Sequence, residues 1–135
     1  MNVIGLFNAG IDTLLSGSTV LTTQLGGTAV YYQAADDDAA MPYVIWNWQS
    51  FMDENQTPSR MFNNILNVRT FASSPAQASA IDGTIDGLLN GHTVSIAGLS
   101  NFWTSRTDAF GDDYKEPNGE RVCVAGGLYR IRVGQ

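Results

Sequence analysis

The sequence is poor in the residues that build metal, redox and nucleic-acid sites. One cysteine, Cys123, and one histidine, His92, occur among 135 residues. A single cysteine excludes a disulfide within the chain and a multi-cysteine metal site. One lysine and six arginines oppose 13 Asp and Glu, which gives a net charge of −6 and a pI of about 4.4. Because phosphate affinity comes mainly from Lys and Arg, we do not expect the surface as a whole to bind nucleic acid.

Long apolar runs are also absent. No stretch approaches the roughly 18 residues of a membrane span, and the first eight residues lack the basic flank of a secretory signal. Hydrophobic residues make up 44% of the chain and charged residues 15%. This composition predicts a folded chain, and its length favours one domain over 1–135. Low charge also suits a subunit that buries much of its surface against neighbours.

Hydrophobic spacing and turn signals predict the order helix, three strands, helix, then two or three strands. Ser74, Pro75 and Gln77 form a capping box at the start of the second main helix, and Ser18 is a cap for a short helical turn. The predicted helices cover 2–15 and 75–89, the strands 28–32, 43–49, 60–71, 94–96, 101–108 and 120–133, and the polar loops 51–59 and 108–119.

This order favours an α+β domain with a single mainly antiparallel, possibly mixed, sheet and two main helices packed on one face. Apolar residues in 61–71 lie on both sides of the expected strand: Phe62, Leu66 and Val68 on one, Met61, Ile65 and Phe71 on the other. We therefore expect both faces to be covered, the second in part by a neighbouring subunit or by extra loops.

Candidate reactive residues all have simpler interpretations. His92 is either a base or metal ligand or a solvated turn residue, and no second histidine completes a site. Cys123 alternates inside an apolar strand, which favours a buried side chain over a nucleophile. Gly126-Gly127 matches no phosphate motif and is interpreted as a β-bulge. We predict no catalytic, cofactor or metal residues, and no enzyme activity.

Several segments together resemble a family of tail-completion proteins, similar to the tail terminators of long-tailed bacteriophages. The resemblance rests on the N-terminal amphipathic helix ending Leu25-Gly26-Gly27, the strand Val30-Tyr31-Tyr32, Met41-Pro42-Tyr43-Val44-Ile45-Trp46, the helix opening Ser73-Ser74-Pro75-Ala76-Gln77-Ala78 and the closing strand. It spans nearly the whole chain in element order. The loop at 108–119 looks longer than in the family, and basic residues are scarcer.

The resemblance implies a structural virion protein, assembled in the host cytoplasm, that forms a ring of usually six copies. Such a ring caps the tail tube and meets the head-side connector, so the expected partners are further copies, the major tail tube protein and a connector or head-completion protein. DNA would pass without sequence-specific binding, and no membrane is involved. Six touching globules of about 37 Å leave a hole of about 37 Å, whereas four leave about 15 Å, too narrow for duplex DNA.

Two alternatives remain open. A head-closure or minor tail protein is the nearest, and the sequence does not separate these roles. A small-ligand module is the other, with Trp46, Trp48, Trp103 and Tyr129 around a pocket.

Two groups of residues are predicted to act in such a ring. Hydrophobic residues of the two long loops are expected to contact the tail tube or an adjacent subunit, or else to fold back on their own domain: Phe51, Met52, Phe110 and Tyr114. Acidic residues are expected to line the channel, or else to keep an outer surface soluble: Asp36, Asp37, Asp38, Asp112, Asp113 and Glu116. The two acidic clusters can share one channel only if the fold brings their loops together.

Overall fold

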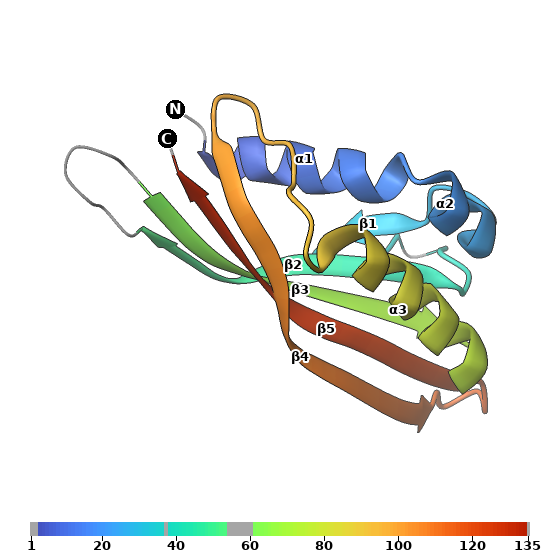
Figure 1. The fold of residues 1–135 in the computed structure, drawn as a ribbon. Helices are drawn as coiled ribbons and strands as arrows, with labels where there is room; N and C mark the ends of the chain where they lie inside the picture. Colours follow the sequence, from blue (N-terminus) through green and yellow to red (C-terminus); the bar gives the residue numbers. More distant parts are fainter. Residues whose placement is uncertain (1–2, 37, 54–60, 135) are drawn as a thin grey trace.

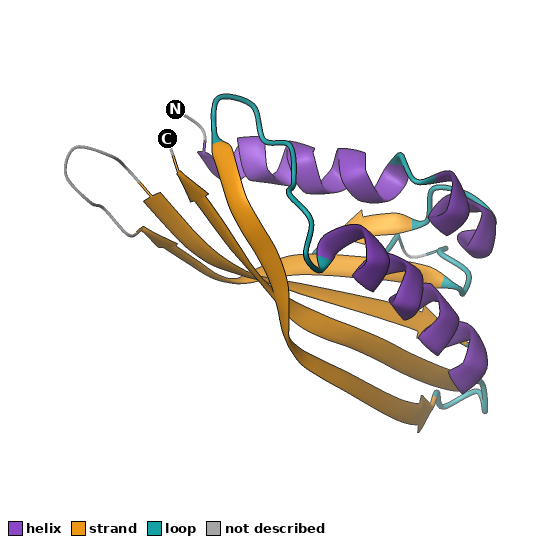
Figure 2. Cartoon of the chain, viewed as in Figure 1, coloured by secondary structure: helices purple, strands orange, loops and turns teal. Residues whose placement is uncertain are grey.

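One five-stranded sheet carries three helices on a single face in the computed structural model, which describes residues 3–36, 38–53 and 61–134 (Figure 1; Figure 2). The strand order is β1-β2-β3-β5-β4, with β1 parallel to β2 and the other neighbours antiparallel. The strands are β1 (Val30–Tyr32), β2 (Tyr43–Asp53), β3 (Met61–Ala72), β4 (Ser100–Lys115) and β5 (Arg121–Gly134). This mixed sheet confirms the predicted α+β class.

The helices begin and end where the sequence signals place them. They are α1 (Val3–Ser16), α2 (Thr19–Leu25) and α3 (Pro75–Leu89). The Ser18 hydroxyl accepts a hydrogen bond from the Leu21 amide, and the Ser74 hydroxyl accepts one from the Gln77 amide, each at 3.2 Å. Both predicted caps are therefore confirmed, because each satisfies a backbone N–H that the first helical turn leaves open.

The core lies between the helices and the inner face of the sheet. Phe7 of α1 makes edge-on aromatic contacts with Trp48, Phe51 and Phe62 at centroid distances of 5.6, 5.0 and 5.8 Å. Fully buried apolar residues of α1, α2 and α3 cover the strands: Ile11, Leu15, Leu21, Ile81, Ile85 and Leu89. Burial of each such side chain stabilises the folded state by about 1.5–3 kcal/mol.

Three predicted segments differ from the structure. The predicted loop 51–59 begins as strand, because β2 continues to Asp53, while residues 54–60 lie outside the described part of the chain. The predicted loop 108–119 is mostly strand, because β4 pairs with β5 as far as Lys115. Conversely, 94–96 is not a strand: Ile96 forms one isolated bridge with Leu99, and its apolar side chain is buried in the core.

The predicted bulge at Gly126-Gly127 is wrong, since both glycines pair in register with β3 and β4. The bulge lies on the partner strand, where Thr107 is inserted between two residues paired with Tyr129 and Leu128. Its hydroxyl donates to the Leu128 carbonyl at 3.3 Å. The glycines instead leave room for side chains: a Cβ at Gly127 would collide with the Arg106 guanidinium.

Candidate interaction surfaces

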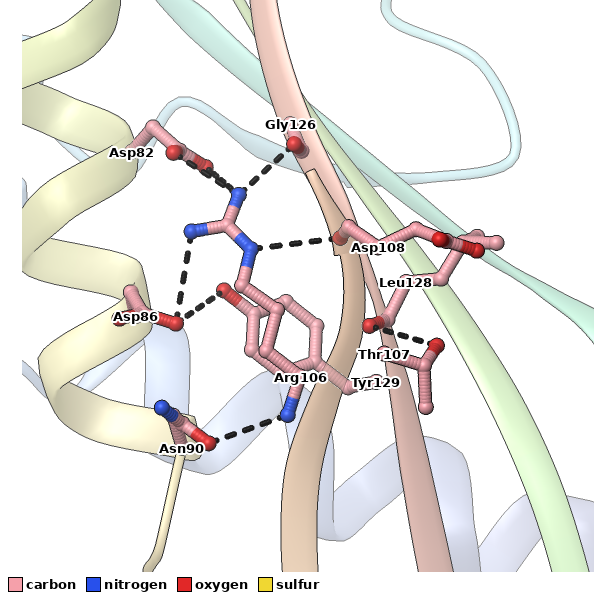
Figure 3. Close-up of polar contacts among 9 residues, drawn as sticks. All are labelled: Asp82, Asp86, Asn90, Arg106, Thr107, Asp108, Gly126, Leu128 and Tyr129. Carbon is pink, nitrogen blue, oxygen red and sulfur yellow. Dashed lines mark hydrogen bonds and ion pairs between the residues drawn. The ribbon is translucent and has the colours of Figure 1, made fainter. Parts of the chain in front are cut away.

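A polar cluster joins α3 to the β4–β5 pair, and Arg106 is its centre (Figure 3). The Arg106 Nη2 donates to both carboxylate oxygens of Asp82 at 3.0 and 2.9 Å and to the Gly126 carbonyl at 2.7 Å. Its Nη1 lies 3.4 Å from an Asp86 oxygen. The Asp86 carboxylate also accepts from the Tyr129 hydroxyl at 3.2 Å.

The electrostatics of this cluster favour a permanent ion pair. Burial acts to lower the pKa of Arg106, but the hydrogen bond to Asp82 and the nearby carboxylates outweigh it and raise that pKa. Burial also raises the pKa of Tyr129 above its ordinary value, so its hydroxyl stays protonated and donates to Asp86. Every polar group points at a partner inside the domain, so the cluster fastens a helix to the sheet. Sequence analysis missed it, because no local motif marks residues that lie far apart in the chain.

Described residues next to the first acidic cluster meet the hairpin of the second at one end of the sheet, which we call the acidic end. Residues 39–41 and Glu116, Pro117, Asn118 and Glu120 of the β4–β5 hairpin line one shallow cavity, and the Asp36 carbonyl accepts from the Ala39 amide at 3.0 Å. Burial raises the pKa of Tyr43 there, with further contributions from Tyr114, Glu116 and Glu120. The residues that follow Asp38 therefore lie beside the hairpin that carries Glu116, and a shared surface for the two clusters stays a prediction.

The acidic side chains differ in their partners. Asp113 pairs with Arg121 at 2.6 Å, and this hydrogen-bonded pair lowers the pKa of Asp113. Asp36, Asp38, Asp112 and Glu116 are exposed and form no ion pair within the described part of the chain. Asp37 lies outside the described residues. The acidic end is thus a solvent-facing surface with mostly uncompensated carboxylates.

Within the described part of the chain, no helix packs on the outer face of the sheet (Figure 2). Alternation along the strands places on it Arg69 and Phe71 of β3, Phe110 of β4 and Leu128 and Arg130 of β5. The Arg69 guanidinium lies 5.6 Å from the Phe110 ring centre. Arg69 and Arg130 are exposed, whereas Phe71, Phe110 and Leu128 are half-buried. The expectation that the described helices cover only one face is met. The outer face carries apolar and basic groups, and the register also places the exposed Asp108 and Asp112 on it.

The four residues predicted to contact partners do not lie together. Phe51 faces inward and packs on Phe7 of its own core. Met52 is 51% exposed near the end of β2, opposite Asn63. Phe110 and Tyr114 share a shallow outer-face pocket close to the acidic end, where Tyr114 is 42% exposed. Phe51 therefore folds back on its own domain, as the alternative interpretation expected. For Met52, Phe110 and Tyr114, contact with a partner stays a prediction.

The side chains considered for chemistry or ligand binding are dispersed. Cys123 is buried beside α3, and this burial raises the pKa of its thiol, while His92 is exposed after α3. Trp46 and Tyr129 lie in the core, whereas Trp103 is 41% exposed, so the tryptophans and Tyr129 do not surround a common pocket.

The described residues contain no group of three or more His, Cys, Asp or Glu side chains placed to hold a metal ion. No single helix within them is long and apolar enough to cross a membrane, although α1 and α2 pass that test as a pair bent by 72°.

Comparison with known proteins finds similar folds but no similar sequence. The sequence matches no family model and no curated protein. A chain in the structure of the virion of a native gene transfer agent particle aligns with a TM-score of 0.81 and 18% identity, over 99% of this chain and 98% of its own. A second solved structure aligns with a TM-score of 0.63 and 12% identity, over 97% and 96%. Likeness at this level of identity establishes a shared fold across the whole chain.

Proposed function

We propose that this chain is a structural subunit of a phage-like virion, and specifically a tail terminator or tail-completion protein that forms a ring on the tail tube. The observation that carries the proposal is the end-to-end match, over 99% of this chain, to a chain of a gene transfer agent virion. The sequence resemblance to tail-completion proteins points to the same class independently. The outer face of the sheet carries half-buried apolar residues and none of the described helices covers it, which supports a role in assembly.

The proposed ring contains six copies, sits between the tail tube and the head-side connector, and lets DNA pass. The acidic end supports a channel role, because carboxylates repel the phosphate backbone and so do not hold DNA in transit. Asp36, Asp38, Asp112 and Glu116 are the exposed candidates for the lining, and Asp37 belongs to the same sequence cluster. A head-closure or minor tail role is the alternative within the same class.

Deletion of the gene separates these roles. A terminator stops tube growth, so particles without this chain should show unjoined heads and tails of irregular length in electron micrographs. A head-closure protein would leave tails of normal length beside heads that lose their DNA. Normal joined particles, with tails of uniform length, would contradict both. Re-expression of the full chain in the deleted strain is the control.

A further inference from the structure

The sequence contains two Asn-Gly dipeptides, Asn90-Gly91 and Asn118-Gly119, and the fold places them in different settings. An asparagine before glycine loses its side-chain amide readily, because the backbone nitrogen of glycine, which no Cβ shields, attacks the carboxamide carbon. The first dipeptide follows α3, and the second lies in the turn of the β4–β5 hairpin, at the acidic end. All four residues are exposed, so exposure alone does not distinguish the two dipeptides.

Hydrogen bonds to β4 hold the first dipeptide in place. The Gly91 amide donates to the carbonyl of Thr104, a fully buried residue, at 2.7 Å. The Asn90 Oδ1 accepts from the Arg106 amide at 3.0 Å (Figure 3). The attacking nitrogen and the carboxamide are thus each bonded to a neighbouring strand. Their reaction requires the end of α3 to separate from β4, and such an opening of packed elements costs more free energy than the opening of an exposed turn.

Hydrogen bonds of the second dipeptide stay within its own turn. The Gly119 amide donates to the Glu116 carbonyl at 2.8 Å and closes a turn that has Pro117 at its second position. The Asn118 Oδ1 accepts from the amide of Glu120, two residues further along, at 2.9 Å. This local bond holds the carboxamide against the adjacent backbone, and the donated N–H stabilises the negative charge that attack places on Oδ1. Residues 116–120 are all exposed, so the turn opens without disturbing the core.

We propose that Asn118 is a site of spontaneous deamidation and that the fold protects Asn90 from the same reaction. The Gly119 nitrogen gives up its proton to water and bonds to the Asn118 Cγ. The bond from Cγ to Nδ2 breaks, and Nδ2 takes up protons and leaves as ammonia, so that a cyclic imide remains. Water then opens the imide at either of its carbonyl carbons, which yields aspartate or isoaspartate. Water is the only other reactant that this sequence requires.

The reaction changes the acidic end. Either product adds a carboxylate between Glu116 and Glu120, which are exposed and form no ion pair in the described ranges. Isoaspartate also routes the main chain through Cβ, which lengthens the turn that Gly119 completes with a φ of +87°. Negative charge therefore accumulates at this end as the protein ages. This inference does not depend on the proposed function, because the chemistry needs the hairpin alone.

Incubation of the purified full-length chain at mildly alkaline pH tests the proposal. Mass spectrometry follows the peptides that contain Asn90 and Asn118, and chromatography separates aspartate from isoaspartate. The same chain unfolded in guanidinium chloride is the control for structure, because unfolding removes the contacts of both dipeptides. Asn118→Gln is the control for chemistry, since a side chain longer by one methylene forms the cyclic imide far more slowly.

In the folded chain Asn118 should convert at least roughly tenfold faster than Asn90, with isoaspartate among its products, and the two rates should converge in the unfolded chain. The rate at Asn118 should rise with pH, because the glycine nitrogen must lose a proton. Equal rates in the folded chain, or faster loss at Asn90, would overturn the proposal. So would an Asn118 that stays intact while the unfolded chain reacts, or aspartate without isoaspartate, which indicates direct hydrolysis.

Discussion

Arg106 reaches three parts of the fold through one side chain, since it contacts α3, the β5 backbone and the Tyr129 ring, which lies 5.5 Å from the guanidinium carbon. Its side chain is 16% exposed, and that of Asp82 is 17% exposed. Arg106→Ala leaves two carboxylates without their counter-charge, so it should lower the free energy of unfolding by about 2–3 kcal/mol. Urea denaturation measures this loss.

Arg121→Ala is the matched control for that experiment. Arg121 and Asp113 form a shorter pair, 2.6 Å against 2.9 Å for Arg106 and Asp82, but both side chains are 49% exposed. Exposed pairs contribute little, so this substitution should lower the free energy of unfolding by much less than Arg106→Ala does. Equal losses from the two substitutions would show that Arg106 does not fasten α3 to the sheet.

Tyr129 should make the free energy of unfolding depend on pH in the alkaline range. Burial raises its pKa in the folded chain above the ordinary value of 10.0, so the folded state keeps a proton that the unfolded state loses. Its contribution is complete below about pH 10 and is lost as the pH rises further. The difference in unfolding free energy between wild type and Tyr129→Phe should therefore shrink from pH 8 to pH 11. A constant difference would contradict the assignment.

At the scale of the elements, glycines in β5 and α3 should respond oppositely to an added methyl group. A Cβ at Gly126 would meet the Val68 carbonyl and, at 2.9 Å, the Phe110 ring, so Gly126→Ala should destabilise the fold by about 1–3 kcal/mol. Gly83 is exposed within α3 and has nothing within 4 Å of the same position. Gly83→Ala should stabilise by about 0.5–1 kcal/mol. Thermal melts of both variants show whether each substitution raises or lowers stability. A stabilising Gly126→Ala would contradict the close approach of Val68 and Phe110 to Gly126.

Local signals explain which elements were predictable. The boundaries of α2 and α3 follow from Ser18 and Ser74, because a capping side chain acts on an amide three residues away. The second half of β4 gives no such signal: 111–115 is exposed throughout and contains Gly, Asp and Tyr. Its strand conformation comes from pairing with β5, a tertiary effect that local propensity does not contain.

At the scale of the whole molecule, the candidate surfaces were predictable only in part. The acidic residues were identified by composition, but the position of the first cluster depends on how residues 39–41, which follow it, meet the β4–β5 hairpin. Phe51 was assigned to a loop because polar residues follow it, whereas extension of β2 turns it onto Phe7. The placement of arginines together on the outer face could be recognised only from the strand order, which no spacing within the sequence reveals.

The acidic end should control DNA passage if it lines the channel. Replacing Asp112 and Glu116 by Lys should slow DNA ejection most at low ionic strength, because the added amines hold phosphates. The matched control is Asp12→Lys, an exposed change on α1. Ejection rates are measured in assembled particles across a salt series. Particles that form normally and eject at wild-type rates at every salt concentration would assign these acids to an outer surface.

The position of the chain in the particle tests the central claim most directly. An epitope-tagged full-length chain is located in intact particles by gold labelling and by electron cryomicroscopy of the neck. We expect label at the head-proximal end of the tail and a ring of six copies whose subunits match the fold over its whole length. Label confined to the capsid shell, or complete absence from particles, would contradict the assignment to a tail-terminating ring.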